Sequence, residues 1–253
     1  MKVKDIMSKP HTIDKSARMS EALDMMDKYH VRRLVVKHKD EVQGIVTLRS
    51  ICGELGSRRK YNHPPSLFHV CDAVSNNFSM IGPEDDLKKA ISMLKDVDCV
   101  VVVDGDVVGS ITTKDVIRNA TPAGTVSSIM KMPVVAPPDA RVAHIRKLMM
   151  EKGVTRVPIM DGHVLVGLVS ETDIAKAFRG IKKHAQQNRQ DNKVEMLIAM
   201  DIMSVSVITV PHDTQIKDAA KLMIEKDIGA LPVMNENNHV IGMITRRDII
   251  KAI

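Results

Sequence analysis

The chain has 253 residues, enough for one large or two ordinary domains, and 44% of them are hydrophobic, so a buried core can form. The formal charge is +6. Only 2% of the residues are aromatic, and this scarcity argues against the stacking platforms of proteins that bind single-stranded nucleic acid. No apolar run approaches the ~20 residues that span a bilayer, and the three cysteines form no C-x-x-C pair, so we expect a cytoplasmic protein with no membrane span, disulfide framework or metal site.

The first predicted unit begins with a short helical lead-in at residues 3–7 and an extended piece at 11–13. A helix is predicted over 16–29, because Met19, Ala22, Leu23 and Met26 recur at helical spacing. Apolar runs at 34–36 and 42–46 predict a β-hairpin around a polar turn. A second helix is expected to start at Thr47.

The same order of elements recurs three more times along the chain. New lead-ins begin at Asp72, Ser128 and Asp201, and Asp-Gly turns at 104–105 and 161–162 mark two of the hairpins. The first helices of these units carry apolar residues at helical spacing: Leu87, Ala90, Ile91 and Leu94; Val142, Ile145 and Met149; Ile216, Ala219, Ala220 and Met223. The sequence therefore predicts four β-α-β-β-α repeats of about fifty residues, each too small to bury its sheet alone.

Each repeat ends in a strand that is followed by a hydroxyl residue and, in three of the four, by an acid three positions later. The four pairs are Thr47 and Ser50, Thr112 and Asp115, Ser170 and Asp173, and Thr245 and Asp248. A hydroxyl and an acid at this spacing predict a capping box at a helix start. A helix start is also a place where an anion can bind, and a carboxylate there can accept hydrogen bonds from a ribose diol.

The repeat resembles the CBS domain, named after cystathionine β-synthase. The resemblance lies in the lead-in Asp201-Ile202-Met203, the strand Leu231-Pro232-Val233 and the ending that runs from Gly242 to Asp248. It implies an α/β fold of four CBS repeats paired into two disc-like Bateman modules with pseudo-two-fold symmetry. We place the repeats at 1–52, 70–119, 126–179 and 200–253, with linkers inside the modules at 53–69 and 180–199 and between them at 120–125.

A chain of four such repeats is similar to the gamma subunit of AMP-activated kinase and to stand-alone prokaryotic CBS proteins. The resemblance implies a non-catalytic regulator that binds AMP, ADP or ATP in clefts between repeats and relays occupancy to a protein effector as a conformational change. S-adenosylmethionine is the alternative ligand, and a monomeric disc or a homodimer of discs is the implied assembly.

The family's ligand positions transfer to this sequence residue by residue. The ribose position falls on Asp115, Asp173 and Asp248, and the helix-start hydroxyl falls on Thr47, Thr112, Ser170 and Thr245. A second polar position falls on Thr12, Ser79 and Thr209, with Val135 in repeat three, and the backbone facing the adenine edge falls on Leu34, Val100, Val157 and Leu231. Repeat one has Ser50 at the ribose position, so its own site lacks the acid.

Phosphate requires cations, which this chain places unevenly. The candidates are Arg32, Arg33, Arg156, Arg246, Arg247 and Lys114. Arginine can bind phosphate through a bidentate fork, although a solvated surface is the alternative interpretation of each residue. Repeat two, from Val70 to Arg118, has 5 Lys/Arg and 9 Asp/Glu, a net of −4.

Other function classes make different predictions. Basic linkers could contact nucleic acid weakly, but such stretches are more often solvated helix faces. The chain has no nucleophile elbow, Walker loop or H-E-x-x-H motif, and one carboxylate per repeat does not suit paired acid–base chemistry. A third alternative is that the chain is a scaffold for protein interactions whose clefts bind no ligand.

Overall fold

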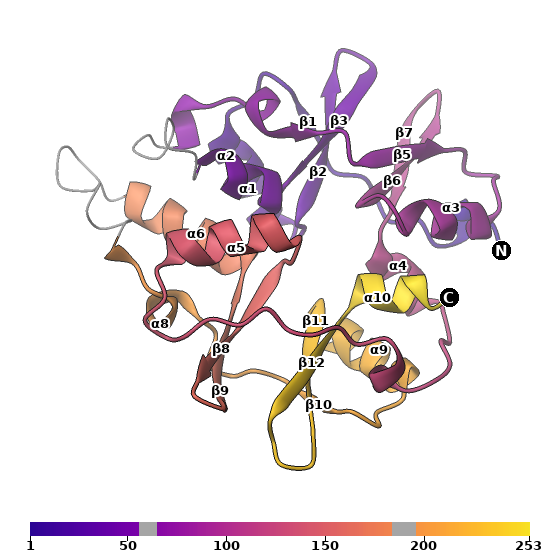
Figure 1. Cartoon of the computed structure of the whole chain (residues 1–253). Helices are drawn as coiled ribbons and strands as arrows, with labels where there is room; N and C mark the ends of the chain where they lie inside the picture. Colours follow the sequence, from indigo (N-terminus) through magenta and orange to yellow (C-terminus); the bar gives the residue numbers. More distant parts are fainter. Residues whose placement is uncertain (56–64, 184–195) are drawn as a thin grey trace. The chain divides into compact units, whose positions relative to one another are not determined.

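The computed structural model describes residues 1–55, 65–183 and 196–253 (Figure 1). Repeat one contains η1 (Val3–Asp5), β1 (Thr12–Asp14), α1 (Met19–Lys28), β2 (Arg33–His38), β3 (Glu41–Thr47) and α2 (Leu48–Leu55). Repeat two, preceded by η2 (Pro65–Leu67), contains η3 (Val70–Ala73), β4 (Val74–Ser75), β5 (Phe78–Ile81), α3 (Leu87–Leu94), β6 (Cys99–Asp104), β7 (Asp106–Ile111) and α4 (Thr113–Arg118). Repeat three contains η4 (Val126–Ser128), α5 (Val142–Lys152), β8 (Arg156–Asp161), β9 (Val164–Ser170) and α6 (Glu171–Lys183). Repeat four contains α8 (Ala199–Ile202), β10 (Val210–Pro211), α9 (Ile216–Glu225), β11 (Ala230–Met234), β12 (Val240–Thr245) and α10 (Arg246–Lys251).

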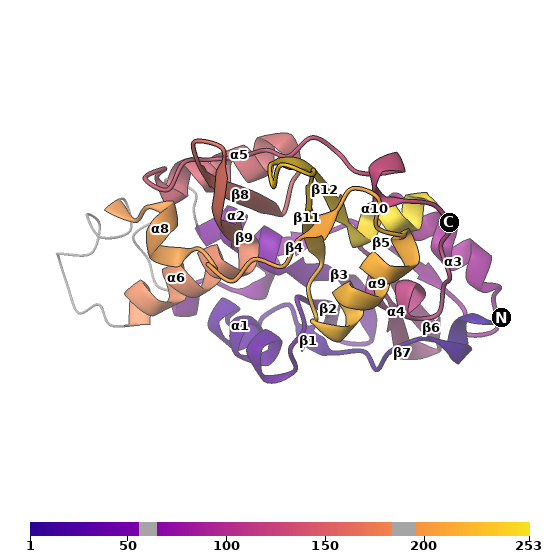
Figure 2. The same cartoon turned by 90° about the horizontal axis from the view of Figure 1, so that it is seen from below.

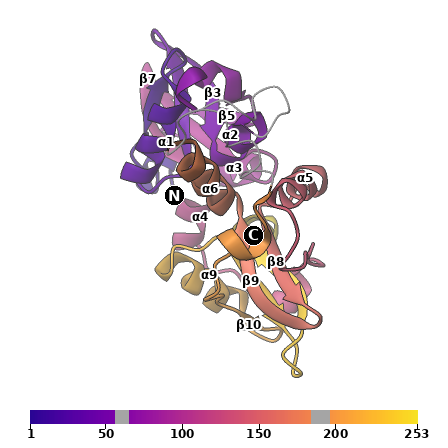
Figure 3. The same ribbon diagram turned by 90° about the vertical axis from the view of Figure 1, so that its left-hand side faces the viewer.

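The predicted α/β repeat is confirmed, and its strands follow one plan. In repeats one, two and four a short strand (β1, β5 or β10) runs parallel to the strand that follows a crossover helix, and that strand forms an antiparallel hairpin with the next one. The remaining short strand, β4, pairs antiparallel with β3 of repeat one. Repeat three lacks the first strand and has a single parallel bridge between Ala136 and Ile159. Its α5 helix lies beside the β8–β9 hairpin (Figure 3). The predicted linkers at 53–69 and 180–199 lie partly outside the described residues.

The first helices bury the apolar residues that the spacing indicated. In α1 these are Met19, Ala22, Leu23 and Met26, and in α9 the buried residues begin at Ile216. Figure 2 shows α9 alongside β11. Hairpin turns use left-handed residues where the sequence has Asp-Gly, with φ of 72° at Gly105, which glycine adopts without a steric penalty.

The described chain forms two compact units, each with its own core. The first unit contains residues 1–11, 76–133 and 208–253, and the second contains 12–75 and 134–207. The first unit therefore holds the hairpins of repeats two and four, where α4 and α10 are neighbours (Figure 1). The second holds the hairpins of repeats one and three, with α2 against α6. The pairing of consecutive repeats into modules stays a prediction.

Both cores are aliphatic, as the composition predicted. Their residues are mainly Val, Ile, Leu, Ala and Met, and no aromatic side chain is among the buried residues of the described chain. In α5, where Arg146 interrupts the apolar spacing, the guanidinium donates to the backbone oxygens of Cys52 and Gly53 at 3.5 and 3.4 Å. The long stem of an arginine lets its charge reach backbone acceptors while its methylenes pack.

Each lead-in packs on the hairpin of the neighbouring repeat instead of on its own. The lead-in of repeat three exchanges two backbone hydrogen bonds with repeat four, between Lys131 and Met243, at 2.9 and 2.8 Å. Ser8 pairs in the same way with Ser110, and Ser204 with Leu168. The residue that pairs on the hairpin always follows a glycine. In repeats two, three and four this glycine admits a methionine of the lead-in, and a Cβ at Gly242 would lie 2.5 Å from Met130 Sδ.

This close approach gives the first prediction. Gly242→Ala is expected to lower the free energy of unfolding by about 1–3 kcal/mol, since the new methyl group must displace the Met130 side chain. Chemical denaturation of the full chain measures the change. Gly82→Ala is the matched control, because its Cβ would meet Asp85 Oδ2 at 3.4 Å, an ordinary contact. Equal stability of the two variants would contradict the packing argument.

A carboxylate on the surface of the first unit fixes the start of the chain there. Glu84 accepts hydrogen bonds from Lys2 Nζ at 2.5 Å and Lys4 Nζ at 2.6 Å. The Lys2 hydrogen bond, followed by that of Lys4, lowers the pKa of Glu84 to about 2 from 4.5. Because the side chain is 59% exposed, solvent and salt weaken these pairs.

The lowered pKa predicts how stability changes in acid. A carboxyl group with a folded-state pKa below its unfolded-state value stabilises the fold above the unfolded pKa and stops doing so as pH falls through the folded pKa. The stability difference between the native chain and Glu84→Gln should therefore be present at pH 6 and shrink between pH 4.5 and about 2. A difference that is constant over this range, measured by denaturation at low salt, would contradict the assignment.

Candidate functional site

The helix start after β12 forms the capping box that the sequence predicted. Asp248 Oδ2 accepts hydrogen bonds from the Thr245 backbone N–H at 2.9 Å and from Thr245 Oγ1 at 2.5 Å. The Asp248 N–H donates to Thr245 Oγ1 at 3.3 Å. Each of the two side chains thus accepts a hydrogen bond from the backbone N–H of the other residue at the first turn of α10. Asp248 uses only one of its two carboxylate oxygens for this.

Repeats two and three repeat this geometry. Asp115 Oδ2 accepts from the Thr112 N–H at 2.8 Å and from its Oγ1 at 2.7 Å. Asp173 Oδ2 accepts from the Ser170 N–H at 2.8 Å and from its Oγ at 2.5 Å. In all three repeats Oδ2 serves the helix, which leaves Oδ1 for other partners.

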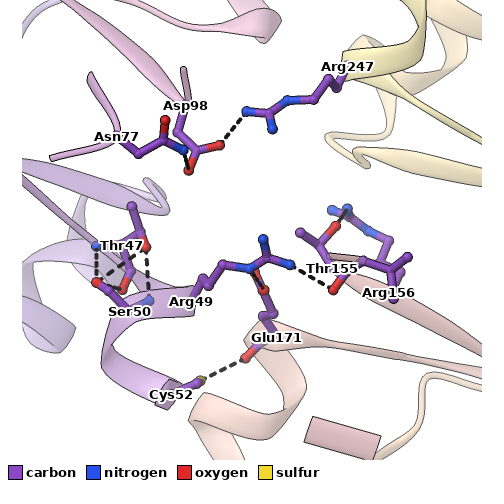
Figure 4. A network of polar contacts seen from close by, with 11 residues as sticks. Thr47, Arg49, Ser50, Cys52, Asn77, Asp98, Thr155, Arg156, Glu171 and Arg247 are labelled. Carbon is purple, nitrogen blue, oxygen red and sulfur yellow. Dashed lines mark hydrogen bonds and ion pairs between the residues drawn. The ribbon is translucent and has the colours of Figure 1, made fainter. Parts of the chain in front are cut away.

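Repeat one keeps the turn but not the charge. The Thr47 N–H donates to Ser50 Oγ at 3.0 Å, and the Ser50 N–H donates to Thr47 Oγ1 at 3.0 Å (Figure 4). Ser50 Oγ also lies 3.0 Å from the Thr47 carbonyl oxygen, to which it donates. A neutral hydroxyl therefore replaces the carboxylate in an otherwise equivalent helix start.

The carboxylates of repeats two and four are buried. Asp115 is 6% exposed and Asp248 5%, and together with Thr47 they are the polar residues in the buried class of the described chain. Burial of a charge is costly unless it is hydrogen-bonded or paired, so these carboxylates depend on defined partners. Neither faces open water.

The lead-in of the neighbouring repeat contacts the remaining carboxylate oxygen in the first unit. Ser8 Oγ donates to Asp115 Oδ1 at 2.5 Å, and Lys131 Nζ lies 2.6 Å from Asp248 Oδ1. Both residues directly follow the lead-in methionine, as Ser204 does in the lead-in on repeat three. The sequence alone did not reveal these contacts, because the shared position after the methionine marks the residues but not the carboxylate that each of them meets.

The first hairpin strand places the predicted adenine-edge positions inside each unit. Leu34, Val100, Val157 and Leu231 are all buried. The second polar positions lie on or next to the first strand, where Ser79 is in register with Val100, Thr12 is in register with Val35 and Thr209 precedes β10. Val135, which takes this place in repeat three, is 45% exposed.

Two of the predicted phosphate residues lie opposite a helix-start hydroxyl. Arg33 pairs across the hairpin with Thr47, and Arg156 pairs with Ser170. Residues directly opposite in an antiparallel pair project from the same face of the sheet. In repeat four Ala230 has this place, opposite Thr245, so its hairpin supplies no cation there. Arg32 is exposed beside Arg33.

The basic residues of the first turns of α4 and α10 are engaged in ion pairs within the first unit. Lys114 Nζ lies 2.5 Å from Asp227 Oδ1, and Arg246 donates to the Met223 carbonyl oxygen at 3.0 Å and lies 3.4 Å from the same Asp227 oxygen. Partial burial raises the pKa of Asp227, but the hydrogen bonds and charges of the two cations outweigh it, and the pKa lies below its ordinary value. A phosphate at Lys114 or Arg246 would have to compete with Asp227.

Arg247 joins repeats two and four inside the first unit. It donates to Asp98 Oδ1 at 2.6 Å, and Asn77 donates to Asp98 Oδ2 at 2.9 Å (Figure 4). Arg247 also donates to the Val97 carbonyl oxygen at 3.2 Å. Arg247 comes two residues after the helix-start hydroxyl. The prediction that Arg247 binds phosphate stays untested, and a phosphate there would have to compete with Asp98.

The second unit has a matching link from the same position of repeat one. Arg49 donates to Glu171 Oε1 at 2.6 Å and to the Val154 carbonyl oxygen at 2.9 Å. Cys52 Sγ contacts the Glu171 carbonyl oxygen at 3.5 Å (Figure 4), and burial raises the pKa of the Cys52 thiol. This thiol stays protonated at neutral pH and suits packing better than nucleophilic chemistry.

Comparisons with known proteins identify all four repeats. A family model of the CBS domain matches residues 3–57, 70–121, 126–180 and 198–253. A protein of Methanocaldococcus jannaschii, MJ1225, is 28% identical over 95% of this chain and 94% of its own length. The crystal structure of MJ1225, a proposed archaeal homologue of g-AMPK, superposes with a TM-score of 0.88 at 26% identity and covers 99% of both chains.

Shorter relatives match about half of the chain. CBSX2 of Arabidopsis thaliana is 29% identical over 47% of this chain and 57% of its own length. A crystal structure of CBSX2 in complex with AMP covers 51% of this chain, with a TM-score of 0.43 and 30% identity. No helix within the described residues is long and apolar enough to cross a membrane.

Proposed function

Because the chain belongs to the CBS-domain family, we propose that it is a non-catalytic regulatory protein that binds adenine nucleotides at its helix-start carboxylates. The observation that supports this most directly is that only one oxygen of each carboxylate caps the helix. Oδ2 of Asp115, Asp173 and Asp248 caps the helix, so Oδ1 is the atom that a ribose hydroxyl would use. A ribose diol donates hydrogen bonds to a carboxylate, and charge makes such bonds stronger than neutral ones.

The surrounding positions suit the rest of an adenine nucleotide. The buried strand residues Val100, Val157 and Leu231 would offer backbone groups and apolar contact to the base. Arg156, opposite Ser170, would meet phosphate in repeat three. Repeat one, with Ser50, would bind a ribose least well.

A route for relaying occupancy follows from the contacts of Oδ1. In the first unit this oxygen also holds the lead-in, through Ser8 in repeat two and Lys131 in repeat four. A ribose that binds Oδ1 would compete with that contact. Ligand would thus favour the arrangement in which the lead-in is released from the carboxylate, since a ligand shifts an equilibrium by its differential affinity for two states. An unidentified protein effector would respond to the change.

Calorimetry of the full chain with AMP, ADP, ATP and S-adenosylmethionine tests this function. We expect saturable heat with at least one adenosine phosphate. S-adenosylmethionine binding alone would favour the alternative ligand class, and no heat with any of the four at millimolar concentration would leave the scaffold interpretation. Binding of random RNA or DNA that survives loss of the carboxylates and weakens steeply with salt would favour a nucleic-acid role.

A further inference from the structure

We propose that Lys131 makes the repeat-four site selective for adenosine ligands that carry phosphate, whereas Ser8 leaves the repeat-two site without that preference. This inference rests on the proposed function and adds the ligand class of individual sites. In the first unit, the lead-in of one repeat brings a side chain to the helix-start carboxylate of the next repeat: Ser8 to Asp115 and Lys131 to Asp248.

The position of Lys131 combines a fixed backbone with an exposed charge. Its backbone exchanges two hydrogen bonds with Met243, two residues before the helix-start hydroxyl of repeat four. Its side chain is 64% exposed, yet the ammonium lies 2.6 Å from Oδ1 of Asp248, which is 5% exposed. The contact therefore reaches from the surface to the oxygen that a ribose would use.

A ribose on Asp248 Oδ1 would displace the ammonium without removing it from the site. The lysine backbone stays paired with Met243, and the four-carbon stem lets the charge swing aside. The 5′-phosphate of a nucleotide is attached to the same sugar ring, so the displaced ammonium would find an anion close by. Adenosine has no such anion, and S-adenosylmethionine has a positively charged sulfonium on the 5′ carbon where a nucleotide has its phosphate.

The two arginines in the first turn of α10 have partners other than the ribose carboxylate, so a ribose on Asp248 would not displace them. Arg246 is bound to the Met223 carbonyl and to Asp227, and Arg247 is bound to Val97 and Asp98. The hairpin position that holds Arg156 in repeat three holds Ala230 here. Lys131 of the lead-in would thus provide repeat four with a positive charge for phosphate, as Arg156 of the hairpin would in repeat three.

Repeat two has the opposite arrangement. The lead-in residue at Asp115 is Ser8, which donates a neutral hydrogen bond at 2.5 Å. Lys114 is paired with Asp227, and residues 70–118 have 5 Lys/Arg against 9 Asp/Glu. A phosphate at this site would find a neutral hydroxyl beside the carboxylate where repeat four has an ammonium, so ligands without phosphate are favoured there.

The test compares AMP with adenosine at single sites of the full chain. Asp115→Asn and Asp173→Asn leave Asp248 as the anchoring carboxylate. In that background Lys131→Met should lower the ratio of AMP affinity to adenosine affinity about tenfold, because a charged hydrogen bond to phosphate is lost. Lys131→Arg should retain the ratio. The ratio should also fall with rising salt only while a cation occupies position 131.

The opposite substitution, a lysine in place of Ser8, tests the same effect at repeat two. With Asp173→Asn and Asp248→Asn as background, Ser8→Lys should raise the same ratio at repeat two by a similar factor. If both ligands bind but neither Lys131→Met nor Ser8→Lys moves the ratio, Lys131 is merely a partner of Asp248 and the inference fails while the proposed function stands. If neither ligand binds to the native chain, both fail together.

Discussion

Asp248→Asn is expected to weaken AMP binding at repeat four about 10- to 100-fold, because asparagine has no charge to strengthen the hydrogen bonds from the ribose hydroxyls. Asparagine has nearly the same shape, and its amide oxygen can still accept from the Thr245 N–H, which Asp248 Oδ2 now accepts at 2.9 Å. The helix start should therefore persist. Calorimetry in the Asp115→Asn and Asp173→Asn background isolates the effect.

Asp201 provides a matched control for this prediction. Its Oδ2 accepts from the Ile198 N–H at 2.9 Å, so it is also the acid of a helix start, but it is exposed and belongs to a lead-in. Asp201→Asn should leave AMP affinity unchanged. Equal losses in the two variants would mean that the carboxylates act through helix stability alone, and no loss in Asp248→Asn would remove the ribose assignment.

Ser50→Asp is expected to create an additional AMP site in repeat one. Ser50 already occupies the capping position, where it accepts from the Thr47 N–H at 3.0 Å, so an aspartate there would meet the donors that Asp173 meets in repeat three. Arg33 lies opposite Thr47 as Arg156 lies opposite Ser170, and Leu34 is buried like Val157. The carboxylate should tighten AMP binding in repeat one about 10- to 100-fold.

The readout is the number of AMP molecules bound per chain, compared with Ser50→Asn. Asparagine matches aspartate in size and lacks its charge, so it should leave the stoichiometry of the native chain. A Ser50→Asp chain that is folded but binds no additional AMP would show that the acid, turn and arginine together do not suffice for a site.

Much of the fold was predictable because its rules are local. The spacing of Met19, Ala22, Leu23 and Met26 predicted α1, and the Asp-Gly pair at 104–105 predicted the turn between β6 and β7. Capping at Thr245 and Asp248 followed from a separation of three residues. Each of these features depends on neighbours in sequence, so a single chain reveals it.

The lead-in exchange was not predictable in this way. Ser8 meets Asp115, and Lys131 meets Asp248, across more than a hundred residues, and no local rule connects them. The contact of Arg247 with Asp98 also joins residues far apart in the sequence, while its assignment to phosphate stays a prediction. Charge in a sequence indicates that a partner is needed, but the fold decides which one.

The helix-start carboxylates of repeats two, three and four are the proposed anchors of an adenosine ligand. Titration of AMP into the native chain and into the variant with Asp115→Asn, Asp173→Asn and Asp248→Asn tests that claim most directly. We predict saturable heat from the native chain and none from the variant at the same concentrations. The same isotherm from both proteins would contradict the account.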